Sequence, residues 1–220
     1  MGFFDMFRSK EKARAEMVGK AWAEILVENE LNATNSTLRA TSTQISNYQY
    51  VSYTCQRIIA LELFYLRIFS VDYALHGNLG SASTRNRIMN ALRTIISERL
   101  AQMTTIINDN YFDSELFDSI QELKRAGVLQ TPLSVTEMCF RDELNQRMSS
   151  YANVVTSSSD SENMCVAISI EFLEAILKKT THLECNGIDE EVQESAGVLA
   201  VRDFIGITKW ISQKSFMLVI

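Results

Sequence analysis

The residues best suited to chemistry are two histidines and four cysteines, and their spacing favours structural roles. His182 and Cys185 stand three positions apart, so together they offer two metal ligands at one helix end. A closed zinc site needs four ligands, and no second pair stands at a useful spacing. His76 and His182 also lack the glutamate three residues earlier that paired-metal sites in helical bundles use. We therefore expect no metal and no other cofactor.

Motifs for covalent catalysis are missing from the sequence as well. It contains no Gly-x-Ser-x-Gly turn and no glycine-rich phosphate loop. The four cysteines, at positions 55, 139, 165 and 185, form no CxxC pair, and residues 1–8 do not resemble a secretory leader. We interpret the cysteines as reduced and mostly buried in a cytoplasmic protein. A helical enzyme whose site is assembled from distant residues remains an alternative.

The charges are distributed unevenly along the chain, although 21 bases against 27 acids leave a net charge of only −6. Residues 33–100 hold seven arginines against three acids, and residues 160–194 hold nine acids against two lysines. The two stretches are expected to neutralise each other within one fold or between subunits. An alternative is an arginine surface for an acidic partner protein, formed by Arg85, Arg87 and Arg93. Nucleic acid is not expected, because the overall charge is negative and lysine clusters are absent.

Both chain ends carry bulky apolar residues. At the start, Phe3, Phe4 and Phe7 precede several basic residues, a pattern typical of a segment that lies on an anionic membrane surface. The same segment is also suited to packing against the core or against a partner.

At the other end, residues 215–220 carry no charged side chain and include Phe216, Leu218 and Ile220. A solvated tail of this kind would be an exposed apolar patch, so we expect it to pack against the body or a neighbouring chain. The two apolar ends together favour self-association.

The elements that must position these residues are predicted to be helices. The 220 residues include only 8 glycines and 1 proline, too few for the many tight turns of a sheet protein. Apolar periodicity and breakers predict helices over 11–31, 43–76, 84–107, 113–125, 134–155, 161–181 and 189–213. Gly127 is expected to end the fourth of these in a left-handed conformation.

The second predicted helix is expected to lie at the centre of the fold. Residues 58–69 are apolar nearly all round, which is typical of a helix enclosed by others. Charged residues at positions 57, 62, 67 and 72 argue against a transmembrane segment. They step around the helix and form no single face, so each is expected to need its own partner.

These observations predict an all-α protein: an irregular bundle of six or seven helices around a long buried central helix. We expect a single domain over residues 1–220, with a possible subdivision near 126–132. The predicted function is that of a non-enzymatic interaction or assembly protein that acts through helix faces and apolar chain ends. The alternatives are a peripheral membrane protein anchored by its N-terminal segment and the helical enzyme described above.

Overall fold

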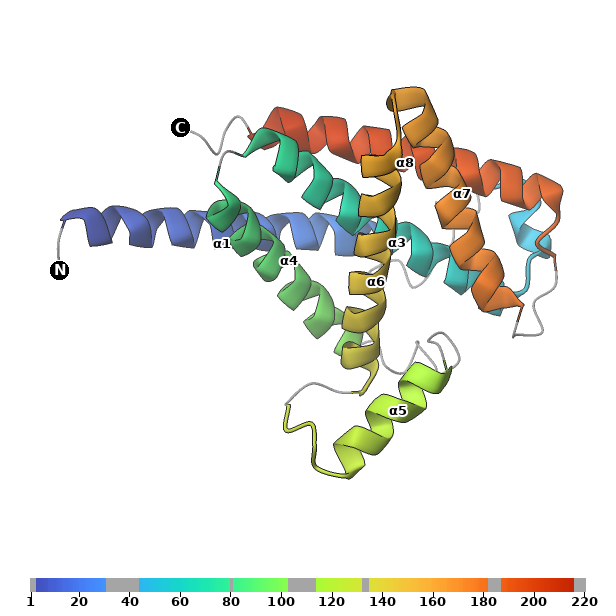
Figure 1. Cartoon of the computed structure of the whole chain (residues 1–220), viewed down its shortest axis with the longest axis horizontal. Helices are drawn as coiled ribbons and strands as arrows, with labels where there is room; N and C mark the ends of the chain where they lie inside the picture. Colours follow the sequence, from blue (N-terminus) through green and yellow to red (C-terminus); the bar gives the residue numbers. More distant parts are fainter. Residues whose placement is uncertain are drawn as a thin grey trace.

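The computed structural model describes residues 3–30, 44–79, 81–102, 114–131, 135–181 and 187–215. Across these ranges the chain forms seven α-helices and one short 3-10 helix, η1, with no strand (Figure 1). The elements are α1 (Phe3–Glu30), η1 (Tyr48–Tyr50), α3 (Tyr53–Asn78), α4 (Ala82–Gln102), α5 (Ser114–Arg125), α6 (Val135–Ser157), α7 (Ser161–Thr180) and α8 (Glu190–Ser215). The predicted all-α multi-helix bundle is therefore confirmed.

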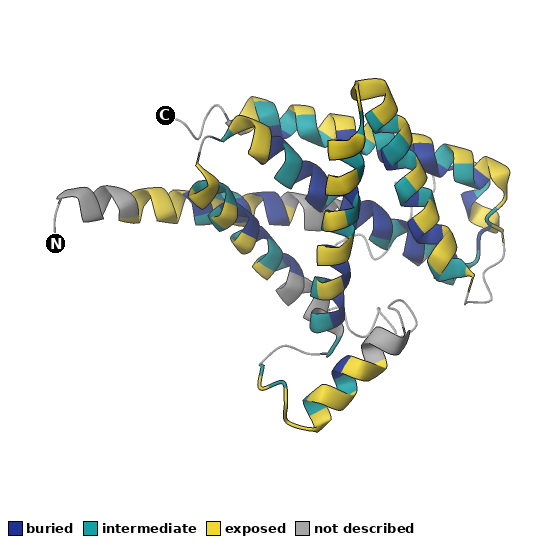
Figure 2. Cartoon of the chain, viewed as in Figure 1, coloured by how far each residue is buried: buried dark blue, intermediate teal, exposed yellow. Residues whose placement is uncertain are grey.

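Helix α3 is the centre of the fold, as the sequence predicted. Ile58, Leu63 and Leu66 are fully buried, and the dark blue stretch of α3 in Figure 2 runs through the middle of the molecule. One side of α3 packs with α1, α4 and α6 in a first apolar cluster. The other side packs with η1, α7 and α8 in a second cluster. Because α3 contributes to both clusters, it joins the two sides of the bundle.

The central helix begins ten residues later than the sequence predicted. Asn47 adopts a left-handed conformation with φ 56°, which a continuing right-handed helix does not allow. The chain then folds back on α3, where the Tyr48 hydroxyl donates to the Gln56 carbonyl oxygen at 2.8 Å. The Gln56 amide in turn donates to the Val51 carbonyl oxygen at 2.8 Å. Asparagine tolerates this conformation better than most residues, which explains why the helix starts only after it.

Helix α1 begins at Phe3, where the sequence predicted a separate N-terminal segment before residue 11. Its first half extends beyond the other helices in Figure 1, and residues 9–14 are exposed. From Ala15 onward α1 packs closely on α4. A Cβ added at Gly19 would lie 2.8 Å from the Ala91 Cβ and even closer to the Ile88 carbonyl oxygen. Only a glycine allows the two backbones to approach this closely.

Helix α5 stands apart from the rest of the bundle and packs mainly on α6 (Figure 1). It ends where predicted, because Gly127 has φ 70° and the Val128 amide donates to the Leu123 carbonyl oxygen at 3.0 Å. The possible subdivision near residues 126–132 remains a prediction. None of the described helices is long and apolar enough to cross a membrane.

The cysteines correct one sequence-based prediction. Cys55 is buried and disulfide-bonded, so the expectation of four reduced cysteines was wrong. Cys139 is buried and Cys165 half-buried, and neither forms a disulfide. Cys185 lies outside the described residues. Disulfides bring together residues that are distant in the sequence, so spacing alone did not reveal this one. The prediction of a cytoplasmic location loses the support of reduced thiols.

Candidate functional site

Five charged side chains meet where α3, α6 and α7 pack together, and we call them the buried ion cluster: Glu62, Glu143, Arg147, Glu171 and Lys179. Glu62 is fully buried on α3. One oxygen of its carboxylate lies 3.0 Å from Arg147 Nε, and the other lies 2.9 Å from Lys179 Nζ. Lys179 Nζ also donates to Glu143 Oε2 at 2.6 Å. Arg147 reaches Glu171 at 3.9 Å.

Two tyrosines border the buried ion cluster. The Tyr65 hydroxyl donates to Glu143 Oε2 at 3.1 Å, and Lys179 Nζ lies 5.5 Å above the Tyr65 ring. The Tyr151 hydroxyl is buried and has no hydrogen-bond partner among the described residues. Burial raises the pKa of both phenols, and the nearby glutamates raise it further. Both rings therefore stay neutral and donor-capable in the folded chain.

The electrostatics of the cluster keep its cations charged. Burial by itself would lower the pKa of Lys179, but the carboxylates of Glu62 and Glu143 outweigh it, so the pKa is raised. Arg147 shows the same balance, with Glu62 as the strongest opposing charge. A lysine held as an ammonium ion is neither a base nor a nucleophile. The arrangement therefore links α3, α6 and α7 through paired charges.

The described residues also form no cluster of metal ligands. Within the described part of the chain, no three His, Cys, Asp or Glu side chains are placed to hold an ion together. The pair of His182 and Cys185 that the sequence singled out lies outside the described residues.

The other central charges also find partners, as the sequence predicted. The Arg67 guanidinium donates to Asp203 Oδ2 of α8 through both Nε, at 2.8 Å, and Nη2, at 2.5 Å. Asp72 accepts two hydrogen bonds from Arg85 of α4, at 2.9 and 2.6 Å. Together with Glu62, these pairs account for three of the four charges, and the side chain at position 57 is not described.

The predicted arginine surface is not gathered on one side of α4. Arg85 is engaged with Asp72, and its Nη1 lies 3.1 Å from His76 Nδ1. Arg87 follows two positions later, which places it on nearly the opposite side of the helix. Arg93 is half-buried further along α4. Their binding of an acidic partner remains a prediction.

The two chain ends are described unequally. Phe3, Phe4 and Phe7 belong to the projecting first half of α1, and their side chains are not described. The C-terminal residues Phe216, Leu218 and Ile220 lie outside the described residues. The contacts predicted for both ends therefore remain predictions.

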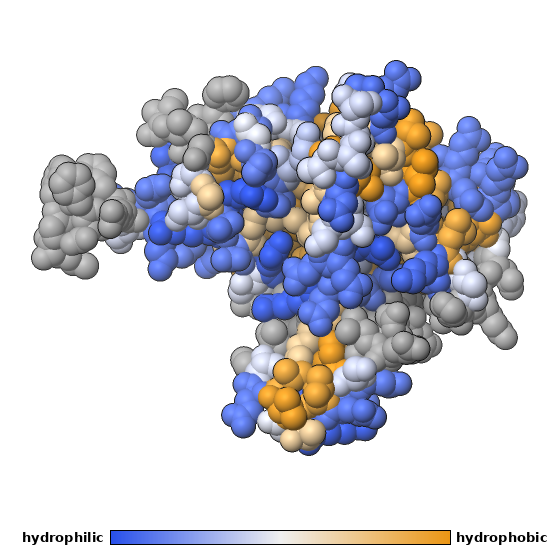
Figure 3. Space-filling model, viewed as in Figure 1, coloured by the Kyte–Doolittle hydropathy of each residue, from blue (hydrophilic) through white to orange (hydrophobic). Residues whose placement is uncertain are grey.

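Helix α7 carries a stripe of apolar side chains on its outer side. It begins where the Asp160 carboxylate accepts a hydrogen bond from the Asn163 amide at 2.9 Å, which also lowers the pKa of Asp160. Val166, Ile170 and Leu177 are 55%, 51% and 37% exposed. Their spacing of four and seven residues aligns them along one side of the helix. Figure 3 shows apolar surface along α7 on the side that faces the viewer.

Helix α8 continues this apolar surface. The Asp189 carboxylate caps its start by accepting from the Val192 amide at 2.9 Å. Val198 and Ile205 are 64% and 50% exposed, although they lie in the middle of the helix. The two helices meet closely at Gly197, where an added Cβ would collide with the Ser169 hydroxyl and touch the Leu173 side chain at 3.4 Å. Val198, the next residue, lies about 100° further around α8 and is exposed.

We call this surface the α7–α8 face. It comprises Val166, Ile170, Leu173 and Leu177 of α7, and Val198, Val201 and Ile205 of α8. Leu173 and Val201 are half-buried, and the other five are exposed.

Sequence reasoning missed this face. The helix predicted over 161–181 holds the apolar series 168–172–176, and Leu173 and Leu177 directly follow two of its members in the sequence. The buried side is formed by Ile168, Phe172 and Ile176, while Leu177 is exposed. The available signal was a second apolar series, 166–170–173–177, which repeats at four and three residues. A helix with two such series has more apolar surface than one core can cover.

Compared with protein-family models, curated proteins and solved structures, the chain matches none of them. Its function is therefore inferred from the geometry of the molecule itself.

Proposed function

We propose that the chain is a non-enzymatic helical assembly protein that associates with further copies of itself through the α7–α8 face. The observation that carries the proposal is the pair of adjoining apolar stripes on α7 and α8. Four of their five exposed members are at least 50% exposed, and Leu177 is 37% exposed. Single exposed apolar residues are common on soluble proteins. Two adjoining stripes on packed helices are typical of a contact surface.

The interior of the protein supports the non-enzymatic part of the proposal. The two buried carboxylates, Glu62 and Glu143, lie in the buried ion cluster, where each cation faces carboxylates at ion-pair distance. Catalytic acids and bases must be free to exchange a proton with a substrate. In contrast, the exposed apolar groups on the α7–α8 face need only a complementary surface.

The test is the mass in solution of the wild-type chain and of the variant Ile170→Glu. The wild type is expected at twice the chain mass of 25.0 kDa. A glutamate in the middle of the α7 stripe would be buried without a partner in the contact, so the variant is expected at the mass of one chain. Light scattering after size exclusion measures both.

The matched control is Lys178→Glu, which changes an exposed residue of the same helix away from the stripe. It is expected to keep the wild-type mass. Equal helical circular dichroism in all three proteins ensures that the variants are folded. A wild-type chain that stays at 25.0 kDa at every concentration, or an Ile170→Glu variant with the wild-type mass, would contradict the proposal.

A further inference from the structure

We infer that two copies of the chain pair through α8 in antiparallel orientation about a two-fold axis. The inference rests on the proposed self-association and names the partner helix and its direction. Its evidence is the order of exposed residues on the outer side of α8: Glu194, then Val198 and Ile205, then Lys209. The stripe is thus acidic towards its N-terminal end, apolar in its middle and basic towards its C-terminal end.

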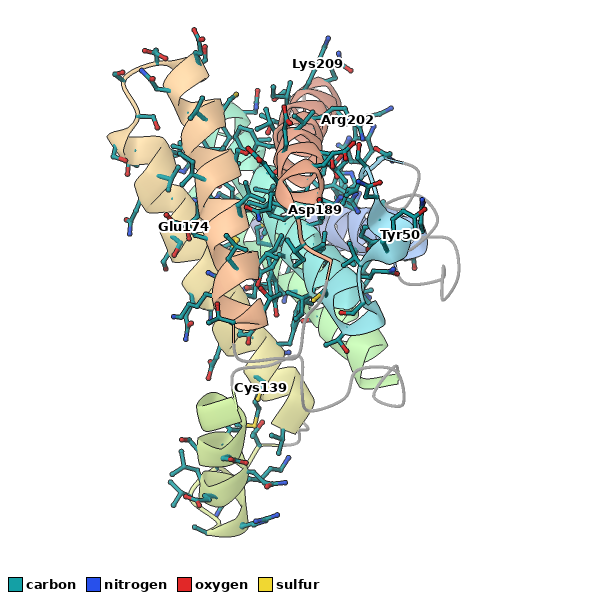
Figure 4. The ribbon with its side chains drawn as sticks, turned by 90° about the vertical axis from the view of Figure 1, so that its right-hand side faces the viewer. Tyr50, Cys139, Glu174, Asp189, Arg202 and Lys209 are labelled. Carbon is teal, nitrogen blue, oxygen red and sulfur yellow. The ribbon has the colours of Figure 1, made fainter. Side chains whose placement is uncertain are left out.

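These four residues share one side of the helix. At about 100° per residue, the steps of four, seven and four positions keep them within a sector of about 60°. All four are exposed, and Figure 4 shows Lys209 extending outward from α8. A second helix laid along this sector would contact all of them.

The stripe is complementary to itself only when the second helix runs in the opposite direction. An antiparallel register that sets Val198 against Ile205 of the second copy also sets Glu194 against its Lys209. Both pairs are symmetric about the same point, between Val201 and Arg202. A two-fold axis there generates each contact twice, as an isologous interface requires. A parallel arrangement would set Glu194 against Glu194 and Lys209 against Lys209, which like-charge repulsion disfavours.

One residue opposes the contact. Arg202 is exposed and lies beside the axis, so its guanidinium meets the same group of the second copy. Figure 4 shows Arg202 extending from the outer part of α8. Two like charges that face each other across the axis weaken the association. The geometry therefore predicts that removing this charge strengthens the dimer, whereas removing Glu194 or Lys209 weakens it.

The experiment is a charge exchange measured by sedimentation velocity, with the dissociation constant of the dimer as readout. Glu194→Lys and Lys209→Glu, each alone, are expected to weaken the dimer about tenfold, because two symmetric ion pairs become like-charge contacts. The double variant restores both pairs in reversed polarity, so its dissociation constant is expected within about threefold of the wild type. Arg202→Gln is expected to lower the dissociation constant severalfold.

The control Glu122→Lys changes the net charge as Glu194→Lys does, but at an exposed position of α5, and is expected to leave the dimer unchanged. If the double variant is no better than the single ones while Ile170→Glu still gives monomers, the α8 pairing is wrong and the self-association stands. If the wild type is a monomer, both fail. Rescue by the double variant, with a tighter Arg202→Gln dimer, supports the pairing.

Discussion

Folded proteins generally have an apolar core and a polar surface, and the buried ion cluster and the α7–α8 face depart from this arrangement in opposite ways. The cluster places charges in the core, and the face places apolar side chains in water. Glu62, in the core, is matched within the chain by Arg147 of α6 and Lys179 of α7. The apolar stripes on α7 and α8 remain exposed in the single chain.

The difference follows from what each departure costs. A buried charge without a partner costs several kcal/mol, so the fold must supply a partner of its own. An exposed valine or isoleucine lowers the stability of a monomer only slightly, and a second molecule can bury it on association. The cluster therefore concerns the stability of the chain, and the face concerns its association.

The largest effect on stability is expected for Glu62→Ala. The change leaves the half-buried Arg147 and Lys179 beside each other without the carboxylate between them, at a cost of about 3–5 kcal/mol. Urea unfolding followed by circular dichroism measures the loss. Glu122→Ala, an exposed change on α5, should stay within about 0.5 kcal/mol. A loss at position 62 as small as that of this control would show that the cluster does not hold the helices together.

The second-largest loss of stability is expected where α1 packs closely on α4. Gly19→Ala forces the two backbones apart, because the new Cβ would meet the Ile88 carbonyl oxygen and the Ala91 side chain. We expect a loss of about 1–3 kcal/mol, typical of overpacking. Gly77→Ala, where an added Cβ meets nothing within 4 Å, is the matched control in another helix. Equal stability of the two variants in urea would contradict the close approach.

The smallest effect at neutral pH is expected for Tyr151→Phe. The hydroxyl makes no hydrogen bond to a described residue, so its loss should change stability by less than about 1 kcal/mol. At high pH the variant should differ more. The pKa of Tyr151 is raised in the folded chain, so above the ordinary value of about 10 the unfolded chain releases the proton first. The stability due to this group is complete below that pH and is lost as the pH rises further.

The pKa values of Tyr65 and Lys179 are raised as well, so the wild-type chain should lose stability steeply above about pH 10. Urea midpoints measured between pH 7 and 11 test this dependence. Tyr151→Phe should show a shallower decline than the wild type. An identical decline in both proteins would mean that the folded chain does not raise the pKa of this phenol.

The sequence predicted the parts of the fold that follow from local pattern. Few glycines and one proline indicated long helices, and the apolar run 58–69 indicated the buried central helix. The charges in that run also indicated that partners were needed, because burial makes an unpaired charge costly. The sequence did not reveal which residues these partners are. Lys179 is one of two bases in the acidic stretch 160–194, and it pairs with Glu62, one of three acids in the basic stretch 33–100.

The parts that were missed depend on contacts between distant segments. The turn at Asn47 is followed by hydrogen bonds between Tyr48 and Gln56 of α3, which helical periodicity does not indicate. The disulfide of Cys55 is likewise set by the fold. The α7–α8 face was missed because both sides of α7 are apolar, and only the packing shows which one is covered.

Sedimentation equilibrium of the unmodified chain, over a hundredfold range of concentration, tests most directly whether the face binds a second copy. We expect a reversible rise from the mass of one chain, 25.0 kDa, to twice that value. A single species of 25.0 kDa throughout the range would contradict it.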